Sequence, residues 1–402
     1  MWRERVAFPV ILLILGLACA AGTAVAQTAD EELLSLTGVQ PALAADVRGG
    51  FAVIWTDTEA ENEGMGIRGC LLAPKDAGCG PHFAVNTTAI GDQTQPAVAA
   101  DDPGRFVVAW QGPVASAAGE PLAGVGIFGQ RFGAGGVKLG SELVLARPEE
   151  GNLLAPKLAL GDDGGFVAVW QSEQAGRSGI EAARFSAKGK PVGQAIPMEA
   201  EGESNNGASV ATYPGGFAVA WHESFERSGG RPDSSFAALA RFDPAGRPVG
   251  KVERLDGLGL DALVGSRAGA LAVFADLEGP SAQRLAASGE AKEGRFPLSR
   301  DFLCSEDRCE TAAAVAMDTR GRFVVIWEVT EHGTISSLFA QLFTPAGKPR
   351  TERIPVSSAP SQGSETPAVA LANDGTVLVA WTRMDTVHPE RSGLYLRRLR
   401  MQ

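Results

Sequence analysis

The sequence predicts an all-β protein in which one unit of strands is repeated seven times. The phrase Phe-Ala-Val-Ile-Trp at residues 51–55 recurs, with small changes, at residues 106–110, 166–170, 217–221, 271–275, 323–327 and 377–381. Successive tryptophans of these copies lie 55, 60, 51, 106 and 54 residues apart, and the longest gap spans one degenerate copy. The chain also holds 50 glycines and 24 prolines, which suits many tight turns. Strand-like segments at this period indicate a radial array of β-sheets.

Each repeat contains four predicted strands whose composition orders them from the centre outwards. In the second copy they cover residues 96–100, 106–111, 126–132 and 142–147. The first is rich in alanine, as expected where sheets converge, and the second is almost wholly apolar, as expected between two neighbouring sheets. The third and fourth carry Arg, Gln and Glu, so they belong on the outside. This gradient is typical of one blade of a β-propeller.

The two ends of the chain predict how the ring closes. The last copy ends after its third strand, residues 393–399, whereas residues 32–37 look like a fourth strand without a blade. Pairing the two leaves no exposed sheet edge. We therefore predict a single seven-bladed β-propeller with four-stranded antiparallel blades, closed by the N-terminal strand; an open stack or two β domains is the alternative. The predicted blades are residues 41–87, 96–147, 156–200, 208–256, 261–300, 311–358, and 367–402 with 32–37.

The repeated tryptophans are predicted to be structural, because they recur in register with the apolar strand. The alternative is a ring of aromatic side chains that stack on a ligand. The fifth copy places Ala275 where the others have tryptophan, with Phe274 beside it, and so predicts a looser blade. The six tryptophans are Trp55, Trp110, Trp170, Trp221, Trp327 and Trp381.

The N-terminus predicts export. Arg3 and Arg5 precede an uncharged stretch, residues 6–21, and Ala24-Val-Ala26 forms a cleavage site, so residues 1–26 read as a signal peptide and residues 27–402 as the mature protein. The location would be periplasmic or extracellular. An uncleaved anchor and lipidation at Cys19 are the alternatives.

The remaining cysteines agree with an oxidising compartment. They form two close pairs, Cys70 with Cys79 and Cys304 with Cys309, and an even count in an exported chain predicts disulfides. Local pairing is the simplest of three connectivities. A zinc site made of all four thiolates would require closer spacing in the first pair.

The repeats, of the form Pro-x-Val-Ala, Gly-Gly-Phe-x-Val-x-Trp and Gly-Ile-x-x-x-Arg-Phe, resemble those of uncharacterised exported bacterial β-propeller proteins over residues 33–402. The resemblance implies the architecture and no particular activity, because propellers host unrelated functions. The recurring dipeptides of WD40 repeats and the Ser-x-Asp-x-Gly-x-Thr-Trp box of sialidases are absent from the sequence.

Composition argues against several classes of function. The net charge of −11 disfavours nucleic acid and anionic membrane surfaces as partners. The four histidines, His82, His222, His332 and His388, form no zinc-binding pattern, and no Gly-x-Ser-x-Gly motif occurs. We therefore expect no metal, no cofactor and no catalytic residue.

One polar pattern remains. The loops between second and third strands and those between blades share one face and are rich in acidic residues, whereas turns between third and fourth strands carry Lys and Arg on the other face. We expect a monomeric, non-enzymatic scaffold that binds a basic protein segment or cations through the acidic face. The alternatives are a hydrolase or lyase at the top of the channel, and a structural surface protein. The expected binding residues are Asp57, Glu59, Glu223, Glu226, Asp276, Glu328 and Glu331.

Overall fold

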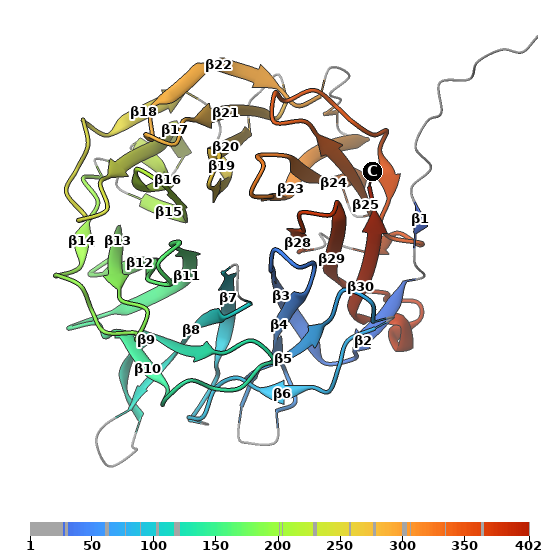
Figure 1. Cartoon of the computed structure of the whole chain (residues 1–402), viewed down its shortest axis with the longest axis horizontal. Helices are drawn as coiled ribbons and strands as arrows, with labels where there is room; N and C mark the ends of the chain where they lie inside the picture. Colours follow the sequence, from blue (N-terminus) through green and yellow to red (C-terminus); the bar gives the residue numbers. More distant parts are fainter. Residues whose placement is uncertain are drawn as a thin grey trace, which may run out of the picture.

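The computed structural model shows seven β-sheets arranged as blades around a central axis (Figure 1). It describes residues 27–28, 31–60, 64–76, 78–88, 90–101, 104–115, 121–200, 202, 204–227, 231–256, 259–275, 279–299, 304–305, 307–333, 335–362 and 366–401. A short 3₁₀ turn, η1 (Pro389–Arg391), interrupts the strands of the last blade. Among these residues there is no helix with the length and apolar character needed to cross a membrane.

The strands of each blade follow one another from the axis outwards. Blade 1 contains β3 (Gly38–Ala45), β4 (Phe51–Asp57), β5 (Gly66–Leu72) and β6 (Phe83–Ala84); blade 2, β7 (Thr94–Ala100), β8 (Phe106–Ala115), β9 (Pro121–Phe132) and β10 (Leu143–Ala146); blade 3, β11 (Asn152–Leu160), β12 (Phe166–Gln174), β13 (Arg177–Phe185) and β14 (Ile196–Pro197). Blade 4 contains β15 (Ser204–Tyr213), β16 (Gly216–Arg227), β17 (Arg231–Phe242) and β18 (Glu253–Asp256); blade 5, β19 (Gly259–Ser266), β20 (Gly269–Ala275), β21 (Ser281–Leu285) and β22 (Ala291–Pro297). Blade 6 contains β23 (Arg308–Met317), β24 (Phe323–Glu331), β25 (Ile335–Phe343), β26 (Ile354–Pro355) and β27 (Ser361–Gln362); blade 7, β28 (Ala368–Leu371), β29 (Thr376–Arg383), β30 (Gly393–Arg400), β2 (Glu32–Ser35) and β1 (Gln27–Thr28).

The predicted fold and its closure are confirmed. Strand β2 pairs antiparallel with β30, with Leu33 opposite Tyr395, so the beginning of the chain completes the last blade. A second segment, β1, pairs further along the same strand, with Gln27 opposite Arg400. The N-terminal segment therefore holds β30 at two places, of which the sequence predicted one.

The tryptophans pack between blades. All six are at most 1% exposed, and each belongs to an apolar cluster shared with the preceding blade. In blade 5 the corresponding residue is Phe274, not Ala275, because Phe274 is buried against blade 4 and Val273 faces blade 6. The sequence alignment of this degenerate copy was one residue out of register, and a large aromatic side chain fills the tryptophan position there.

The innermost strands of blades 1 to 6 each contain a β-bulge. In β3, β7 and β11 the bulge contains a non-glycine residue with positive φ: Gln40, Gln95 and Ala155 respectively. The exposed N–H groups of two of these bulges donate to glutamine side chains of the preceding blade, Gln95 to Gln40 Oε1 at 2.9 Å and Ala155 to Gln111 Oε1 at 2.9 Å. These bonds satisfy backbone donors that have left the sheet ladder.

Arginines from third strands join consecutive blades. Arg131 Nη1 donates to Ala187 O at 2.8 Å, and Arg284 Nη1 donates to Pro345 O at 2.6 Å; in each case the carbonyl belongs to the turn between third and fourth strands of the next blade. Arg398 of β30 donates to the carbonyls of Ala73, Pro74 and Asp76 in blade 1. The last of these arginines therefore ties blade 7 to blade 1.

Both predicted disulfides are present. Cys70 on β5 is bonded to Cys79 in the turn that follows it, with Cα atoms 5.9 Å apart. Cys304 is bonded to Cys309 at the start of β23, where the two residues also form an isolated β-bridge. Each bond therefore braces a turn or loop at the edge of a blade.

Candidate functional site

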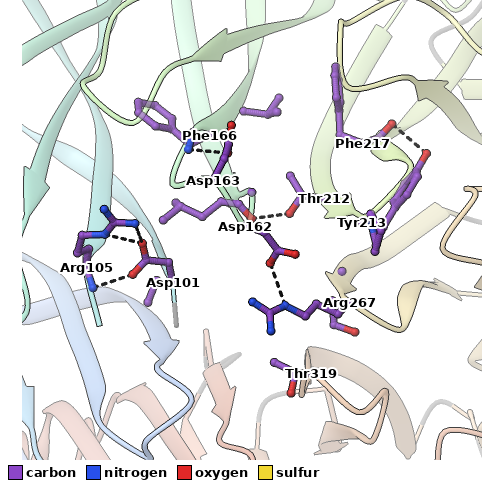
Figure 2. Close-up of a pocket in the computed structure, with 18 of the residues that line it drawn as sticks. Asp101, Arg105, Asp162, Asp163, Phe166, Thr212, Tyr213, Phe217, Arg267 and Thr319 are labelled. Carbon is purple, nitrogen blue, oxygen red and sulfur yellow. Dashed lines mark hydrogen bonds and ion pairs between the residues drawn. The ribbon is translucent and has the colours of Figure 1, made fainter. Parts of the chain in front are cut away.

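The candidate site is a cavity of about 690 Å³ at one mouth of the axis, which we call the central cavity. It is lined by the first turns, meaning the turns between first and second strands, of the blades around the ring. Figure 2 shows polar side chains from several of these turns pointing toward one another. Charged lining residues are Asp46, Asp101, Asp162, Asp163, Asp318, Arg105, Arg184 and Arg267.

Some of these charged side chains pair with another residue of the same turn. Asp101 accepts hydrogen bonds from the backbone and the guanidinium of Arg105, with the Nε–Oδ2 distance at 2.7 Å. Asp318 makes the same arrangement with Arg322 and its side chain is fully buried. These pairs fix the turns in place.

Two other carboxylates each have one oxygen that accepts no hydrogen bond from the described residues. Asp46 Oδ1 accepts the N–H groups of Arg48 and Gly50, and Asp163 Oδ1 accepts the N–H of Gly165 at 2.9 Å. Within the described residues, the second oxygens of Asp46 and Asp163 have no protein donor. The cavity therefore offers hydrogen-bond acceptors that its own structure does not satisfy.

One ion pair crosses the cavity. Asp162 in the first turn of blade 3 accepts from Arg267 Nε in the first turn of blade 5 at 3.1 Å, although blade 4 lies between them (Figure 2). Both side chains are more than half exposed, so the pair contributes little stability. The pair holds two charged side chains near each other at the cavity, and its weakness means that they can separate.

Tyr213 lies at the edge of the central cavity, from the end of β15. Its hydroxyl donates to Phe217 O at 3.2 Å, and burial raises the pKa of this phenol. The neutral form therefore prevails at physiological pH, and the hydroxyl is held as a hydrogen-bond donor to the backbone.

The sequence analysis did not identify the first turns, or their acidic residues, as part of a site. It assigned the basic turns between third and fourth strands to one face, but in an antiparallel blade the first turns open on that same face. Ser186 and Pro244, from turns between third and fourth strands, line the central cavity beside Asp46 and Asp162. The predicted basic face thus has a mixed acidic and basic centre. The Asp that directly follows the Ala-rich strand in blades 1, 2 and 6 (Asp46, Asp101 and Asp318) was the signal that could have revealed it.

Several of the acidic residues that were expected to bind a partner are buried in the structure. Asp57 pairs with Arg68 at 2.7 Å, Glu223 pairs with Arg254 at 2.8 Å, and Glu328 accepts from Ser336 at 2.7 Å; all three are under 9% exposed. Their carboxylates serve internal contacts. Glu59 and Glu331 are exposed, as a partner-binding role would require. The side chain of Glu226 and all of Asp276 lie outside the described residues.

The histidines lie apart from the central cavity. Burial lowers the pKa of His222 on β16, and His82 packs edge-on against Trp55 with ring centroids 4.9 Å apart. His332 and His388 are exposed, near Asp307 and Glu390 respectively. In the part of the chain that the structure describes, no three His, Cys, Asp or Glu side chains gather in a way that would hold a metal ion.

The geometry defines a seven-bladed β-propeller with a polar cavity at its axis. No protein-family model and no curated protein match the sequence. Among solved structures, a protein of unknown function from Dyadobacter fermentans is 13% identical over 94% of this chain and 99% of its own, with a TM-score of 0.52. The polysaccharide lyase Uly1 is 12% identical over 90% of each chain, with a TM-score of 0.51. An acylaminoacyl peptidase is 11% identical over 92% of this chain and 51% of its own, with a TM-score of 0.50.

These likenesses, at low identity, show the fold alone. They nevertheless correct one expectation. The lack of a zinc-binding histidine pattern and of a Gly-x-Ser-x-Gly motif led us to expect that the protein is not an enzyme, yet the same architecture occurs in a polysaccharide lyase and in a peptidase. The expectation that the protein is not an enzyme is therefore wrong. A hydrolase or lyase fits the architecture.

Proposed function

We propose that the protein is a ligand-binding propeller whose site is the central cavity, and that its ligand is a small polar molecule rich in hydroxyl or amino groups. The observation that carries the proposal is the pair of carboxylates, Asp46 and Asp163, whose second oxygens lack a protein donor among the described residues. Carboxylates only accept hydrogen bonds, so a matching ligand must donate them. The cavity volume falls within the range of small-molecule sites, about 300–1,000 Å³.

Direct binding measurements test this proposal. Glucose, glucosamine and spermidine present hydroxyl groups, both groups, and amino groups respectively, and each would be titrated into the full mature chain by calorimetry. We expect at least one to bind, and Asp46→Asn and Asp163→Asn each to weaken it about tenfold, because each removes one charge-assisted hydrogen bond. Glu59→Gln, on the opposite face, is the matched control. Binding that is unchanged in both Asp variants, or absent for all three probes, contradicts the proposal.

Cleavage of the bound molecule is the second candidate function. The cavity combines carboxylates, which can carry general acid–base chemistry, with guanidinium groups, which can stabilise developing negative charge. A polysaccharide lyase of the same architecture is consistent with this proposal. Incubation with neutral and uronic-acid polysaccharides, followed by product analysis, distinguishes hydrolysis, elimination and simple binding. The site would then be at the mouth formed by the first turns, opposite the mouth that the sequence suggested.

Export and a partner at the acidic face remain proposals as well. The two disulfides favour an oxidising compartment, as export would require. Sequencing the mature N-terminus from the native host tests cleavage. Binding of a basic segment or cations would involve the exposed Glu59 and Glu331, and its affinity should fall as salt is raised.

A further inference from the structure

The central cavity is not symmetric about the axis. Most of its lining residues lie in first turns or in the strand residues beside them, but some lie further out, in third strands or in the turns between third and fourth strands. All of these outer residues belong to blades 3 and 4: Arg184, Phe185, Ser186, Ala187, Val192 and Pro244. The cavity therefore extends outwards from the axis between these two blades, and we call this extension the side arm.

The first turn of blade 4 leaves the space for the side arm. Only two residues, Pro214 and Gly215, connect β15 to β16 in blade 4, whereas five residues connect β11 to β12 in blade 3. The Gly215 N–H donates to Ala287 O of blade 5 at 2.8 Å, so this short turn leans toward blade 5 and away from blade 3. A Cβ atom at Gly215 would lie 2.6 Å from the same carbonyl oxygen, so the approach requires glycine.

Apolar side chains line most of the side arm. Phe166 of β12 and Phe217 of β16 line the cavity from opposite sides (Figure 2), and Val192 and Pro244 are exposed at the outer end. Arg184 also lines the side arm, but its Nη1 donates to Pro244 O at 2.9 Å, so the guanidinium already has an acceptor in the protein. Apolar surface that is exposed inside a cavity favours a ligand that covers it with apolar atoms.

We propose that the ligand of the central cavity is amphipathic, with a hydrogen-bond-donating head at the axis and an apolar group in the side arm. This inference rests on the proposed function and narrows its ligand class. Asp163 lies three residues before Phe166, and its second oxygen has no protein donor among the described residues. A hydroxyl or amino group that donates to Asp163 therefore carries its substituent beside the side arm. A wholly polar molecule such as glucose would leave the apolar surface of the side arm in water.

Calorimetry with matched series of ligands tests the proposal on the full mature chain. The probes are β-glucosides and N-substituted 1,3-diaminopropanes, each with a methyl, butyl or hexyl group, used below the concentrations at which they form micelles. In a series whose head binds, each added methylene should strengthen binding about two- to fourfold until the side arm is filled. The heat-capacity change of binding should become more negative over the same members, because that change reports the burial of apolar surface.

A pair of variants at equivalent positions locates the apolar group. Val192→Asn places an amide in the side arm and should weaken binding of the hexyl members about tenfold, while the methyl members bind as before. Val249→Asn in blade 4 is the matched control: the two valines are 39% and 40% exposed, and the N–H of each donates to a third-strand carbonyl at 2.8 Å. Val249 is not among the residues that line the central cavity, so its variant should change no affinity.

The outcomes separate this proposal from the proposed function. If the methyl members bind and depend on Asp46 and Asp163, but the longer members bind no better, the proposed function stands and the present proposal is overturned. If affinity rises with chain length equally in the unaltered chain and in both Val variants, the gain is non-specific partitioning, and the present proposal is again overturned. If no member of either series binds, both proposals fail.

Discussion

At the scale of single residues, some acidic side chains that were expected to bind a partner instead form contacts inside the protein. Glu223 was expected to meet a partner, but its side chain is fully buried, where it accepts from Trp221 Nε1 at 3.1 Å and pairs with Arg254. It therefore anchors an inter-blade tryptophan. The sequence could not reveal this, because the partner arginine is 31 residues away in an outer strand.

Removing this carboxylate should destabilise the protein strongly. Glu223→Ala removes the acceptor of Trp221 Nε1 and the carboxylate that pairs with Arg254 Nε, and we expect a loss of about 3 kcal/mol or more in the free energy of unfolding. Glu223→Gln retains an acceptor for the indole and should lose less. Urea unfolding followed by tryptophan fluorescence measures both. Glu59→Gln, which is exposed, should change stability by less than about 0.5 kcal/mol; an equal effect there would contradict the structural role of Glu223.

His222 gives the protein an acid-sensitive component of stability. Its pKa is lowered by burial, and its Nε2 is buried without a hydrogen-bond partner among the described residues. Below the ordinary pKa of about 6.5, the unfolded chain takes up a proton that the folded chain resists, so stability falls as pH drops toward the lowered pKa and is then constant. His222→Gln should lose this pH dependence in urea titrations between pH 7.5 and pH 5. The exposed His332→Gln should retain it.

At the scale of elements, the strand pattern was predictable, whereas the contacts between elements were not. Apolar second strands and Ala-rich first strands follow from local composition, because burial on both faces and convergence at the axis restrict side-chain size. The arginines of third strands were assigned to a solvated outer layer. Arg131, Arg284 and Arg398 instead reach carbonyls of the next blade, and such backbone acceptors have no sequence signature.

Arg398 should matter most among these, because it donates to three carbonyls. Arg398→Met keeps much of the apolar stem and removes the donors, and we expect a loss of about 2 kcal/mol in the free energy of unfolding. The neighbouring Arg400→Met, whose side chain is exposed at the end of β30, is the control. Thermal unfolding of both variants measures the difference; equal melting temperatures would show that the inter-blade bonds add nothing.

The two disulfides should stabilise the folded protein by different amounts, in an order that the loop lengths predict. In the chain-entropy model, the bond with a separation of nine residues, Cys70–Cys79, stabilises by about 2.6 kcal/mol, and the one with a separation of five, Cys304–Cys309, by about 2 kcal/mol. Replacing Cys70 and Cys79 with serine should cost more still, since Cys70 is fully buried in an apolar cluster. Chemical denaturation of the two double-serine variants tests this order, and a larger loss for the Cys304–Cys309 pair would contradict it.

At the scale of the whole molecule, the repeat predicted the ring, but degeneracy and topology limited the prediction of the site. Phe274 replaces tryptophan one residue earlier than the alignment placed it, since only packing against blade 4 shows which face it occupies. The central cavity forms where first turns from around the ring meet, and residues as distant as Asp162 and Arg267 become neighbours. No local pattern encodes that meeting.

Closure of the ring supplies the final prediction. Glu31, just before β2, pairs with Arg383 of β29, and its second oxygen accepts the N–H of Ser358 at 2.9 Å, so one carboxylate joins the N-terminal segment to blades 6 and 7. The two charged side chains are only 9% and 7% exposed. Glu31→Ala leaves Arg383 buried without its partner and should cost about 3–5 kcal/mol.

The location of the loss distinguishes ring opening from general instability. Hydrogen exchange in Glu31→Ala should accelerate first in β30, which pairs with the N-terminal segment, and in β29, which carries Arg383, while β12 and β13 of blade 3 stay protected until global unfolding. Glu390→Ala, on the exposed turn η1 of the same blade, is the matched control and should leave exchange in β30 unchanged. Uniform acceleration across all blades would mean that the ring unfolds as one unit and that its closure is not the first contact to open.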